Sequence, residues 1–348
     1  MKRLALAGAM ILISLNSFAW TEVTRIMDEG QALGIYTGAS LLVGSGDHVL
    51  FQYSVGDSNP GRIYDVASLT KVVATTTLIM VLEEKGKLAL TDRVSKYIPC
   101  VTSGVTLEDL HRHRAGLPAG ARPKENETLD LYINRICQLK LSYVPGSRTL
   151  YSDLSYILLG RVVEIVSDKP LKELADEFIF RPLKMINSGF NVKNCAPTSE
   201  YRNCQVHDPT AFHFLPLHVG NAGLFASLDD LTLFVRMIVG KGEVNGTRIV
   251  SKATIEKMLI KVGPRGLGWD YEDEFFTAPR GEVFPPGISF GHTGYTGNSI
   301  WIDPKSDSYY IFVSNRVFMG DDRTRAPFSK LRKELSTAIG KKVYEISE

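Results

Sequence analysis

A serine and a lysine stand three residues apart at the start of an apolar segment, in the stretch YDVASLTKVV at residues 64–73. On a helix, positions i and i+3 share one face with about 5–6 Å between their Cβ atoms, so the amine of Lys71 can reach the hydroxyl of Ser68. Such a pair can act as a nucleophile and its base. It can also be a plain helix start, with Ser68 as the cap and Lys71 extending to water.

Two further segments contain residues that would complete a nucleophilic site. In VPGSRTLYSDLSYILLG, residues 144–160, Tyr151 comes just before a helical pattern that begins near Ser152. Its phenol can serve as a base if nearby cations lower its pKa from about 10. The segment GHTGYTGNSIWID, residues 291–303, is rich in glycine and runs into a strand, which allows a ligand close to the backbone. Alone, each segment is also typical of an ordinary interfacial tyrosine and a glycine-bearing strand.

Taken together and in this order, the three motifs resemble those of the penicillin-recognising serine hydrolases. They are Ser68-x-x-Lys71, Tyr151-Ser152-Asp153 and His292-Thr293-Gly294. The branch they resemble contains class C β-lactamases, serine DD-carboxypeptidases and related esterases. Four other segments resemble recurring segments of this branch, namely 110–118, 206–211, 221–231 and 266–269. The resemblance covers nearly all of the chain after its first 19 residues.

The resemblance implies a mechanism and a set of site residues. Ser68 attacks a carbonyl carbon, while Lys71 and Tyr151 share the role of base and pass the proton to the leaving group. The backbone N–H groups of Ser68 and Tyr295 form the oxyanion hole, and the His292-Thr293-Gly294 segment binds substrate. The ammonium is expected to depress the pKa of the phenol, and burial that of the lysine. No cofactor is implied.

Two residues depart from the family pattern. Asp153 stands where the family usually has asparagine, and an ionised carboxylate only accepts hydrogen bonds. We expect Asp153 to pair with Lys71 or another cation and to hold the lysine charged. His292 stands where β-lactamases commonly have lysine, and histidine is only partly charged near neutral pH. This second change favours a DD-carboxypeptidase over a dedicated β-lactamase.

The spacing around a predicted turn, PKSD at residues 304–307, suggests a further substrate-binding residue. If residues on either side of this turn form a hairpin, Arg316 lies opposite Gly294 and on the same face as His292. Arg316 would then provide the carboxylate anchor that a lysine provides elsewhere. The alternative is a surface arginine on an edge strand.

The N-terminus has the features of a secretory signal peptide. Lys2 and Arg3 precede an apolar stretch at 4–15 that is too short to span a bilayer comfortably, and small residues precede a cleavage point after Ala19. We therefore expect a bacterial periplasmic or secreted protein, residues 20–348, with no stable membrane anchor; a retained anchor is the alternative. The net charge of +2 and the absence of basic runs argue against nucleic-acid binding and leave a small molecule or peptide as the partner.

Four cysteines in an exported chain favour disulfides. Cys195 and Cys204 flank a short polar loop and are the favoured pair, which leaves Cys100 with Cys137. Four reduced, buried thiols are the alternative. The cysteines lack C-x-x-C spacing and the histidines lack HExxH spacing, so no metal site is expected.

The patterns along the chain predict an α+β fold. Strand-like runs occur at 37–43 and 48–55 and again at 299–303 and 308–317, and a helical pattern ends the chain. The region between them, roughly 72–260, is mainly helical. We therefore expect a single domain of the β-lactamase/transpeptidase type, with an antiparallel sheet built from both termini. Its α/β lobe comprises residues 20–65 and 262–348, and its helical lobe about 66–261.

The sequence thus predicts an exported serine hydrolase that acts through acyl-Ser68 on peptidoglycan-like D-alanyl peptides. A class C-like β-lactamase or a small-ester hydrolase on the same scaffold is the first alternative. A non-catalytic module that binds penicillin or cell wall is the second.

Overall fold

The structure is a computed structural model that describes residues 20–101, 104–202, 204–272 and 277–347. The signal peptide expected at residues 1–19 lies outside the described residues. In the part of the chain that is described, no helix combines the length and apolar composition needed to cross a bilayer.

The main sheet has five antiparallel strands in the order β2-β1-β9-β8-β7. Its strands are β1 (Gly38–Ser45), β2 (His48–Gly56), β7 (Phe290–Gly294), β8 (Asn298–Asp303) and β9 (Ser308–Ser314). This confirms the predicted antiparallel sheet built from both termini and both predicted hairpins. It also shows that 290–294, taken from the sequence as glycine-rich chain leading into a strand, is itself the edge strand β7.

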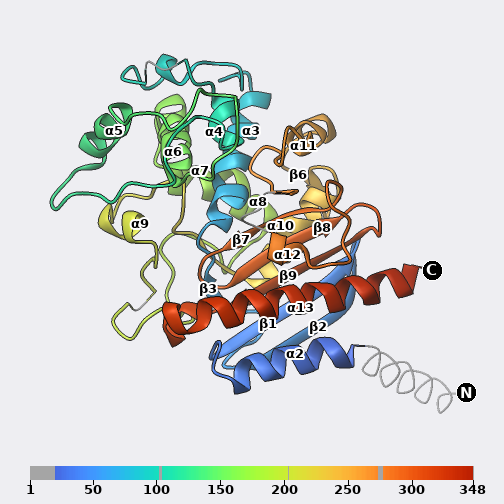
Figure 1. Cartoon of the computed structure of the whole chain (residues 1–348). Helices are drawn as coiled ribbons and strands as arrows, with labels where there is room; N and C mark the ends of the chain where they lie inside the picture. Colours follow the sequence, from blue (N-terminus) through green and yellow to red (C-terminus); the bar gives the residue numbers. More distant parts are fainter. Residues whose placement is uncertain (1–19, 102–103, 203, 273–276, 348) are drawn as a thin grey trace, which may run out of the picture.

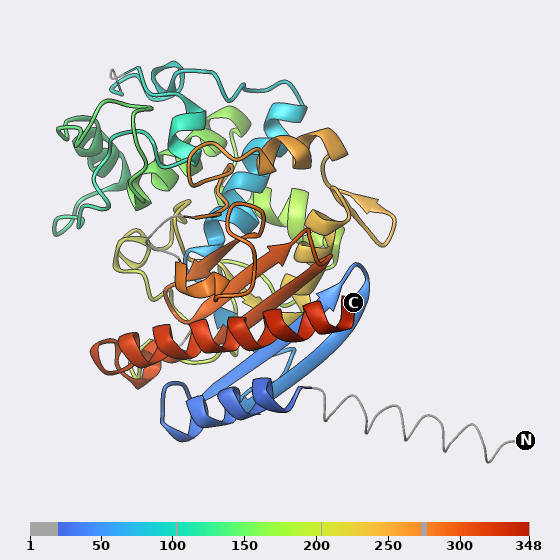
Figure 2. The ribbon, with the colours of Figure 1, turned by 45° about the vertical axis from the view of Figure 1, so that its right-hand side comes forward.

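Two helices from opposite ends of the chain cover one face of this sheet. Helix α2 (Thr21–Ala32) and helix α13 (Asp321–Ser347) lie side by side against it in both views of the ribbon (Figure 1, Figure 2). Their apolar residues pack with those of β1 and β9, because alternate strand residues point to this face. Representative members of the cluster are Val23, Ile26, Leu41, Phe312, Phe328 and Leu335.

The larger hydrophobic core lies on the other face of the sheet. Helix α10 (Leu228–Val239) packs directly on β9 and β1, although it belongs to the part of the chain expected to form the helical lobe. On this side of the sheet lies a helix composed of the π-helical segment η1 (Lys71–Thr76) and α3 (Thr77–Glu84), which is buried on all sides from Lys71 to Leu82. A helix apolar all round is expected to be buried in this way.

Several of the remaining elements pack on this buried helix, and two others pack on α13. The remaining elements include the helices η2 (Val94–Lys96), α4 (Leu107–His111), α5 (Leu129–Cys137), α6 (Asp153–Ser167), α7 (Leu171–Ala175), η3 (Asp176–Phe180), α8 (Arg181–Leu183), α9 (Pro209–His213), α11 (Lys252–Leu259), α12 (Thr277–Arg280) and η5 (Arg316–Met319). Two small sheets pair β3 (Ile63–Asp65) with β4 (Phe225–Ser227), and β5 (Glu243–Val244) with β6 (Thr247–Arg248).

Both predicted disulfides are present. Cys100 is bonded to Cys137 and Cys195 to Cys204, with Cα–Cα distances of 5.6 and 5.5 Å. The first ties the end of α5 to the loop after η2, and the second closes the polar loop before α9.

Candidate active site

Ser68 lies in a tight turn between strand β3 and the buried helix. Three successive i→i+3 hydrogen bonds, each 3.0 Å, run from Leu69 N, Thr70 N and Lys71 N to the carbonyls three residues before them. The chain then widens into the π-helical turns of η1, a conformation that is often found at functional sites. Ala67, directly before Ser68, has a φ of 46°, in the left-handed region that a residue with a side chain rarely adopts.

Asp65 holds this turn in place. Its Oδ1 accepts a hydrogen bond from Ala67 N at 2.8 Å and its Oδ2 one from His207 N at 2.6 Å. Its backbone carbonyl accepts hydrogen bonds from Thr296 Oγ1 in the β7–β8 turn and from Asn298 Nδ2 at the start of β8. Asp65 is buried, and this burial raises its pKa to about 6. Asp65 is therefore hydrogen-bonded to the turn that contains Ser68 (the nucleophile turn), to the loop at His207 and to the connection between β7 and β8.

Three of the oxygens around the Lys71 amine belong to Ser68, Asn221 and Asp153. Nζ donates to Ser68 Oγ at 2.9 Å and to the Asn221 carbonyl at 2.8 Å, and it forms an ion pair with Asp153 Oδ1 at 2.6 Å. An ammonium has three N–H groups and no acceptor, so this environment suits the charged form. The expected pairing of Asp153 with Lys71 is confirmed.

The pKa values of Lys71 and Tyr151 differ from the expectation. Burial lowers the pKa of Lys71, but the charges of Asp153 and Tyr151 and hydrogen bonds to both outweigh it, and the net shift is upward. For Tyr151, burial raises the pKa, because it disfavours the charged phenolate. The charge of Lys71 lowers this pKa and that of Asp153 raises it, and the net shift is again upward. The expected depression of both pKa values is therefore wrong. In the resting site the lysine is charged and the phenol is neutral.

Tyr151 is buried beside Ser68 and Lys71, and its phenol makes hydrogen bonds with both. Its ring centroid lies 5.1 Å from Lys71 Nζ and 4.4 Å from the ring of His113. The guanidinium carbon of Arg265 lies 5.3 Å from the same ring, and the ring of His292 lies 6.0 Å away. Two histidines and an arginine, all buried, thus surround the phenol.

The end of strand β7 closes the other side of the site. Thr293, Gly294 and Tyr295 line a cavity of about 700 Å³ together with Ser68, Tyr151 and Asp153. A Cβ added to Gly294 would lie 2.3 Å from the carbonyl oxygen of Val66, so the absence of a side chain lets β7 pack against the nucleophile turn. Within the described chain, the sequence motifs therefore meet at one cavity.

Comparison with known proteins identifies the family of the chain. A family model described as Beta-lactamase matches residues 23–333. The chain belongs to the beta-lactamase family. Membership of this family assigns the chain to the serine hydrolases. Its two disulfides are consistent with an exported protein.

Named relatives of this beta-lactamase family chain include a provisionally named D-alanyl-D-alanine carboxypeptidase of Escherichia coli K12. It is 29% identical over 302 residues, covering 74% of this chain and 69% of the relative. Similar solved structures include a β-lactamase/D-alanine carboxypeptidase from Pseudomonas syringae, with 17% identity and a TM-score of 0.71 over 90% of this chain and 98% of the other. A hydrolase with promiscuous acyltransferase activity has 21% identity and a TM-score of 0.71, over 92% and 99% of the two chains. The two structures establish the fold.

Arg316 lines the same cavity, but not for the expected reason. Strand β9 pairs with β8 rather than β7, because the turn at 295–297 folds β7 back, and β9 ends at Ser314. The prediction that Arg316 lies opposite Gly294 in a hairpin is therefore wrong. Arg316 starts η5, where its guanidinium donates to Asp321 Oδ1 at 2.7 Å and to the Tyr295 carbonyl.

Several residues that contact the candidate site escaped the sequence reasoning. His113 lies in the 110–118 segment but was not singled out from the sequence as a site residue; its ring contacts Tyr151 and its Nδ1 accepts a hydrogen bond from Ser152 N at 3.0 Å. Arg265 directly precedes the 266–269 segment, which was recognised without that residue. Asn221 begins another recognised segment, and its carbonyl, which binds Lys71, has no signal in a side-chain pattern.

Proposed function

We propose that this chain is an exported DD-carboxypeptidase-type hydrolase that cleaves peptidoglycan-like D-alanyl peptides through an acyl intermediate on Ser68. The observation that carries the proposal is the Lys71 amine 2.9 Å from the Ser68 hydroxyl, with the Tyr151 phenol hydrogen-bonded to both at the wall of one cavity. A nucleophile, a base and an adjacent substrate space meet the geometric requirements for acyl transfer.

In the proposed reaction, Ser68 Oγ attacks the carbonyl carbon of the scissile amide and its proton passes to the Lys71–Tyr151 pair. The backbone N–H groups of Ser68 and Tyr295 stabilise the oxyanion. The C–N bond then breaks, the departing amine takes the proton, and water hydrolyses the acyl-enzyme. Loss of one oxyanion donor typically raises a barrier by about 2.7–4 kcal/mol, so the docking of β7 matters as much as the base.

The resting protonation state sets a condition on this mechanism. With Lys71 charged and Tyr151 neutral, neither group is a free base, and the coupled pair must lose one proton to become active. Because both pKa values are shifted upward, the rate of acylation is expected to rise toward alkaline pH.

We further infer that the substrate lies along β7, with Asp153, His292, Thr293, Gly294 and Arg316 as its binding residues. Burial, then the charges of Arg265 and Lys71, lower the pKa of His292 well below 6.5, so this ring is neutral. A substrate carboxylate would thus meet its positive charge at Arg316. Export to the periplasm is supported by the signal-peptide pattern and by the two disulfides.

Labelling with fluorescent penicillin and an assay for released D-alanine together test the proposal. The full-length mature chain is expected to be labelled and to release D-alanine from an N-acyl-D-alanyl-D-alanine peptide. Ser68→Ala abolishes both, because no other group forms the acyl bond, and Ser45→Ala in the β1–β2 hairpin leaves both unchanged. Rapid release of the label would indicate a β-lactamase instead, ester cleavage without labelling an esterase, and stable labelling without turnover a binding module.

A further inference from the structure

Helix α13 forms a wall of the catalytic cavity that is unusually rich in guanidinium groups. Arg325 and Arg332 line the cavity from this helix, together with Phe328 and Ser329, and Arg316 lines it from η5. Arg316 and Arg325 share one carboxylate, that of Asp321, at 2.7 and 2.9 Å. These three arginines therefore have one carboxylate partner between them among the described residues.

Arg332 is the member of this group without a polar partner. In the part of the chain that the structure describes, its guanidinium forms no ion pair and no hydrogen bond, and its Nε is shielded from solvent. It lies 5.1 Å from the ring of Phe328, whose centroid is also 5.6 Å from the Arg316 guanidinium. Burial lowers the pKa of Arg332 to about 10, so it still carries its charge at neutral pH.

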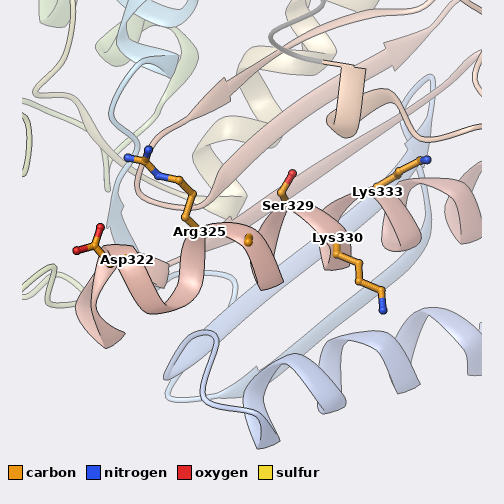
Figure 3. Close-up of a pocket in the computed structure, with 6 residues that line it drawn as sticks. Asp322, Arg325, Ser329, Lys330 and Lys333 are labelled. Atoms are coloured by element: carbon orange, nitrogen blue, oxygen red, sulfur yellow. The ribbon is translucent and has the colours of Figure 1, made fainter.

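Arg332 is only partly exposed and has no counter-ion among the described residues, so an anion that enters the cavity can form a charged hydrogen bond with it. Arg332 and Arg316 both contact Phe328, so a ligand that reaches one guanidinium is near the other. Figure 3 shows that Arg325 and Ser329 project from the same side of α13, whereas Lys330 projects from the opposite side. Lys330 therefore marks the side of α13 away from Ser329, whereas Lys333 projects from the same side as Arg325.

We propose that the α13 wall, with Arg332 at its centre, is a second anion subsite, and that the preferred peptides end in a D-amino acid that carries a side-chain carboxylate. This inference rests on the proposed function. The terminal α-carboxylate would bind at Arg316 and the second carboxylate at Arg332, within reach of the Ser329 hydroxyl. Planar guanidinium groups suit carboxylates because they donate two parallel hydrogen bonds.

Binding to the Ser68→Ala chain tests the subsite without any need for turnover. The probes are N-acetyl-D-alanyl-D-glutamate and N-acetyl-D-alanyl-D-glutamine, which have similar shapes and differ in one charge, and the measurement is titration calorimetry at pH 7.5. We expect the glutamate peptide to bind about tenfold more tightly or better, as is typical when a charged hydrogen-bond partner is available. Equal affinities would overturn the inference, whatever happens to any variant.

Two variants locate the effect. Adding Arg332→Gln is expected to remove the preference for glutamate, whereas Lys330→Gln, which removes one charge from the opposite side of the same helix, is expected to retain it. Arg332→Lys keeps the charge and serves if the glutamine variant does not fold. A preference lost in both the glutamine and the Lys330 variants would show general attraction by α13 and contradict a site at Arg332.

Hydrolysis by the unmodified chain separates the two proposals. Cleavage of both peptides at equal rates, with equal binding, would contradict the subsite and leave the peptidase function standing. A clear binding preference with neither peptide cleaved would contradict the proposed function and leave the anion subsite standing.

Discussion

At the scale of single residues, Asp153 decides the protonation state of the site. Its carboxylate lies 2.6 Å from Lys71 Nζ, and its charge raises the pKa of both Lys71 and Tyr151. The family commonly has an amide at this position. An amide would leave the burial of Lys71 without this compensation, and burial alone favours the neutral amine. Asp153 therefore stabilises the charged lysine at the expense of the free base.

The variant Asp153→Asn is expected to activate the enzyme at neutral pH. Removing the carboxylate lowers the pKa of Lys71 and of Tyr151, so the deprotonated form of the pair appears at lower pH. The rising limb of kcat/KM against pH should move down by about one unit or more, since one unit corresponds to about 1.4 kcal/mol. The profile is measured as the rate of penicillin acylation between pH 5 and 10.

Asp176→Asn is the matched control for this shift, because it removes an ion-paired carboxylate on an exposed surface, beside Arg181. Its profile is expected to follow that of the unmodified chain. An unchanged profile in Asp153→Asn would show that another group sets the resting state.

The ion pair could be predicted from the sequence, but its consequence could not. Asp153 comes two residues after the motif tyrosine, so it was expected close to Lys71. Its pairing with a cation could therefore be predicted from the motif. The pKa directions depend on how deeply Lys71 and Tyr151 are buried and on which charges remain near them. Those quantities follow from the packing of Asn221, His113 and Arg265, which belong to distant parts of the chain.

At the scale of elements, the site depends on how strand β7 docks on the nucleophile turn. The β7–β8 hairpin is tied to the carbonyl of Asp65 by Thr296 and Asn298, and Gly294 lies against Val66. In the proposed oxyanion hole, this contact sets the distance between the backbone N–H groups of Ser68 and Tyr295. The oxyanion hole proposed here is thus a property of two elements rather than of either one.

Replacing Gly294 by alanine tests this docking. The added Cβ would lie 2.3 Å from the Val66 carbonyl, which is backbone, so β7 must move away from the turn. A misplacement of about 1 Å can cost about 100-fold in rate, and we expect a loss of acylation of that order. The measurement is the second-order rate of penicillin labelling, with circular dichroism to confirm that the chain is folded.

Gly61→Ala is the control, because its added Cβ meets nothing closer than 3.4 Å and its φ lies outside the left-handed region. It should label at the normal rate. A folded Gly294→Ala chain that also labels at the normal rate would show that β7 does not set the geometry of acylation.

The elements with a strong periodic pattern were predictable from the sequence. Both hairpins alternate around clear turn residues, and the last helix repeats its apolar residues at three- to four-residue steps. Strand β7 was missed because Gly291, His292, Thr293 and Gly294 have weak strand character, and only pairing with β8 makes them a strand. The place of Arg316 was missed for the same reason, since the turn at 295–297 changes which strands are neighbours.

At the scale of the whole molecule, chain segments distant in the sequence meet at Tyr151. His113 follows α4 on the helical side, His292 belongs to β7 in the sheet, and both rings lie near the phenol. The order and spacing of the three motifs were enough to predict this convergence and the fold class. They were not enough to predict that two neutral histidines and a buried arginine would fill the junction.

This junction predicts a loss of stability in mild acid. Burial, followed by the charges of Arg265 and Lys71, lowers the pKa of His113 well below 6.5. A depressed folded-state pKa means that the stability from this residue is present above about pH 6.5 and is lost as the pH falls, because the unfolded chain takes up the proton first. The loss is about 1.4 kcal/mol per pH unit for each such histidine, until the folded state is also protonated.

The variant His113→Gln isolates this effect from the other buried groups. Asp65 acts in the opposite direction, because its raised pKa makes the folded state more stable as the pH falls from about 6, so the slope of the unmodified chain is a sum. The difference in unfolding free energy between the unmodified chain and His113→Gln removes Asp65 from the comparison. Urea unfolding at pH 7.5, 6.0 and 5.0 should show this difference shrinking by about 1.4 kcal/mol per unit below pH 6.5. The control is His48→Gln, at an exposed position of β2, for which the difference in unfolding free energy should not change with pH. If the difference for His113→Gln is also independent of pH, the junction tolerates a charged imidazole and the prediction is wrong.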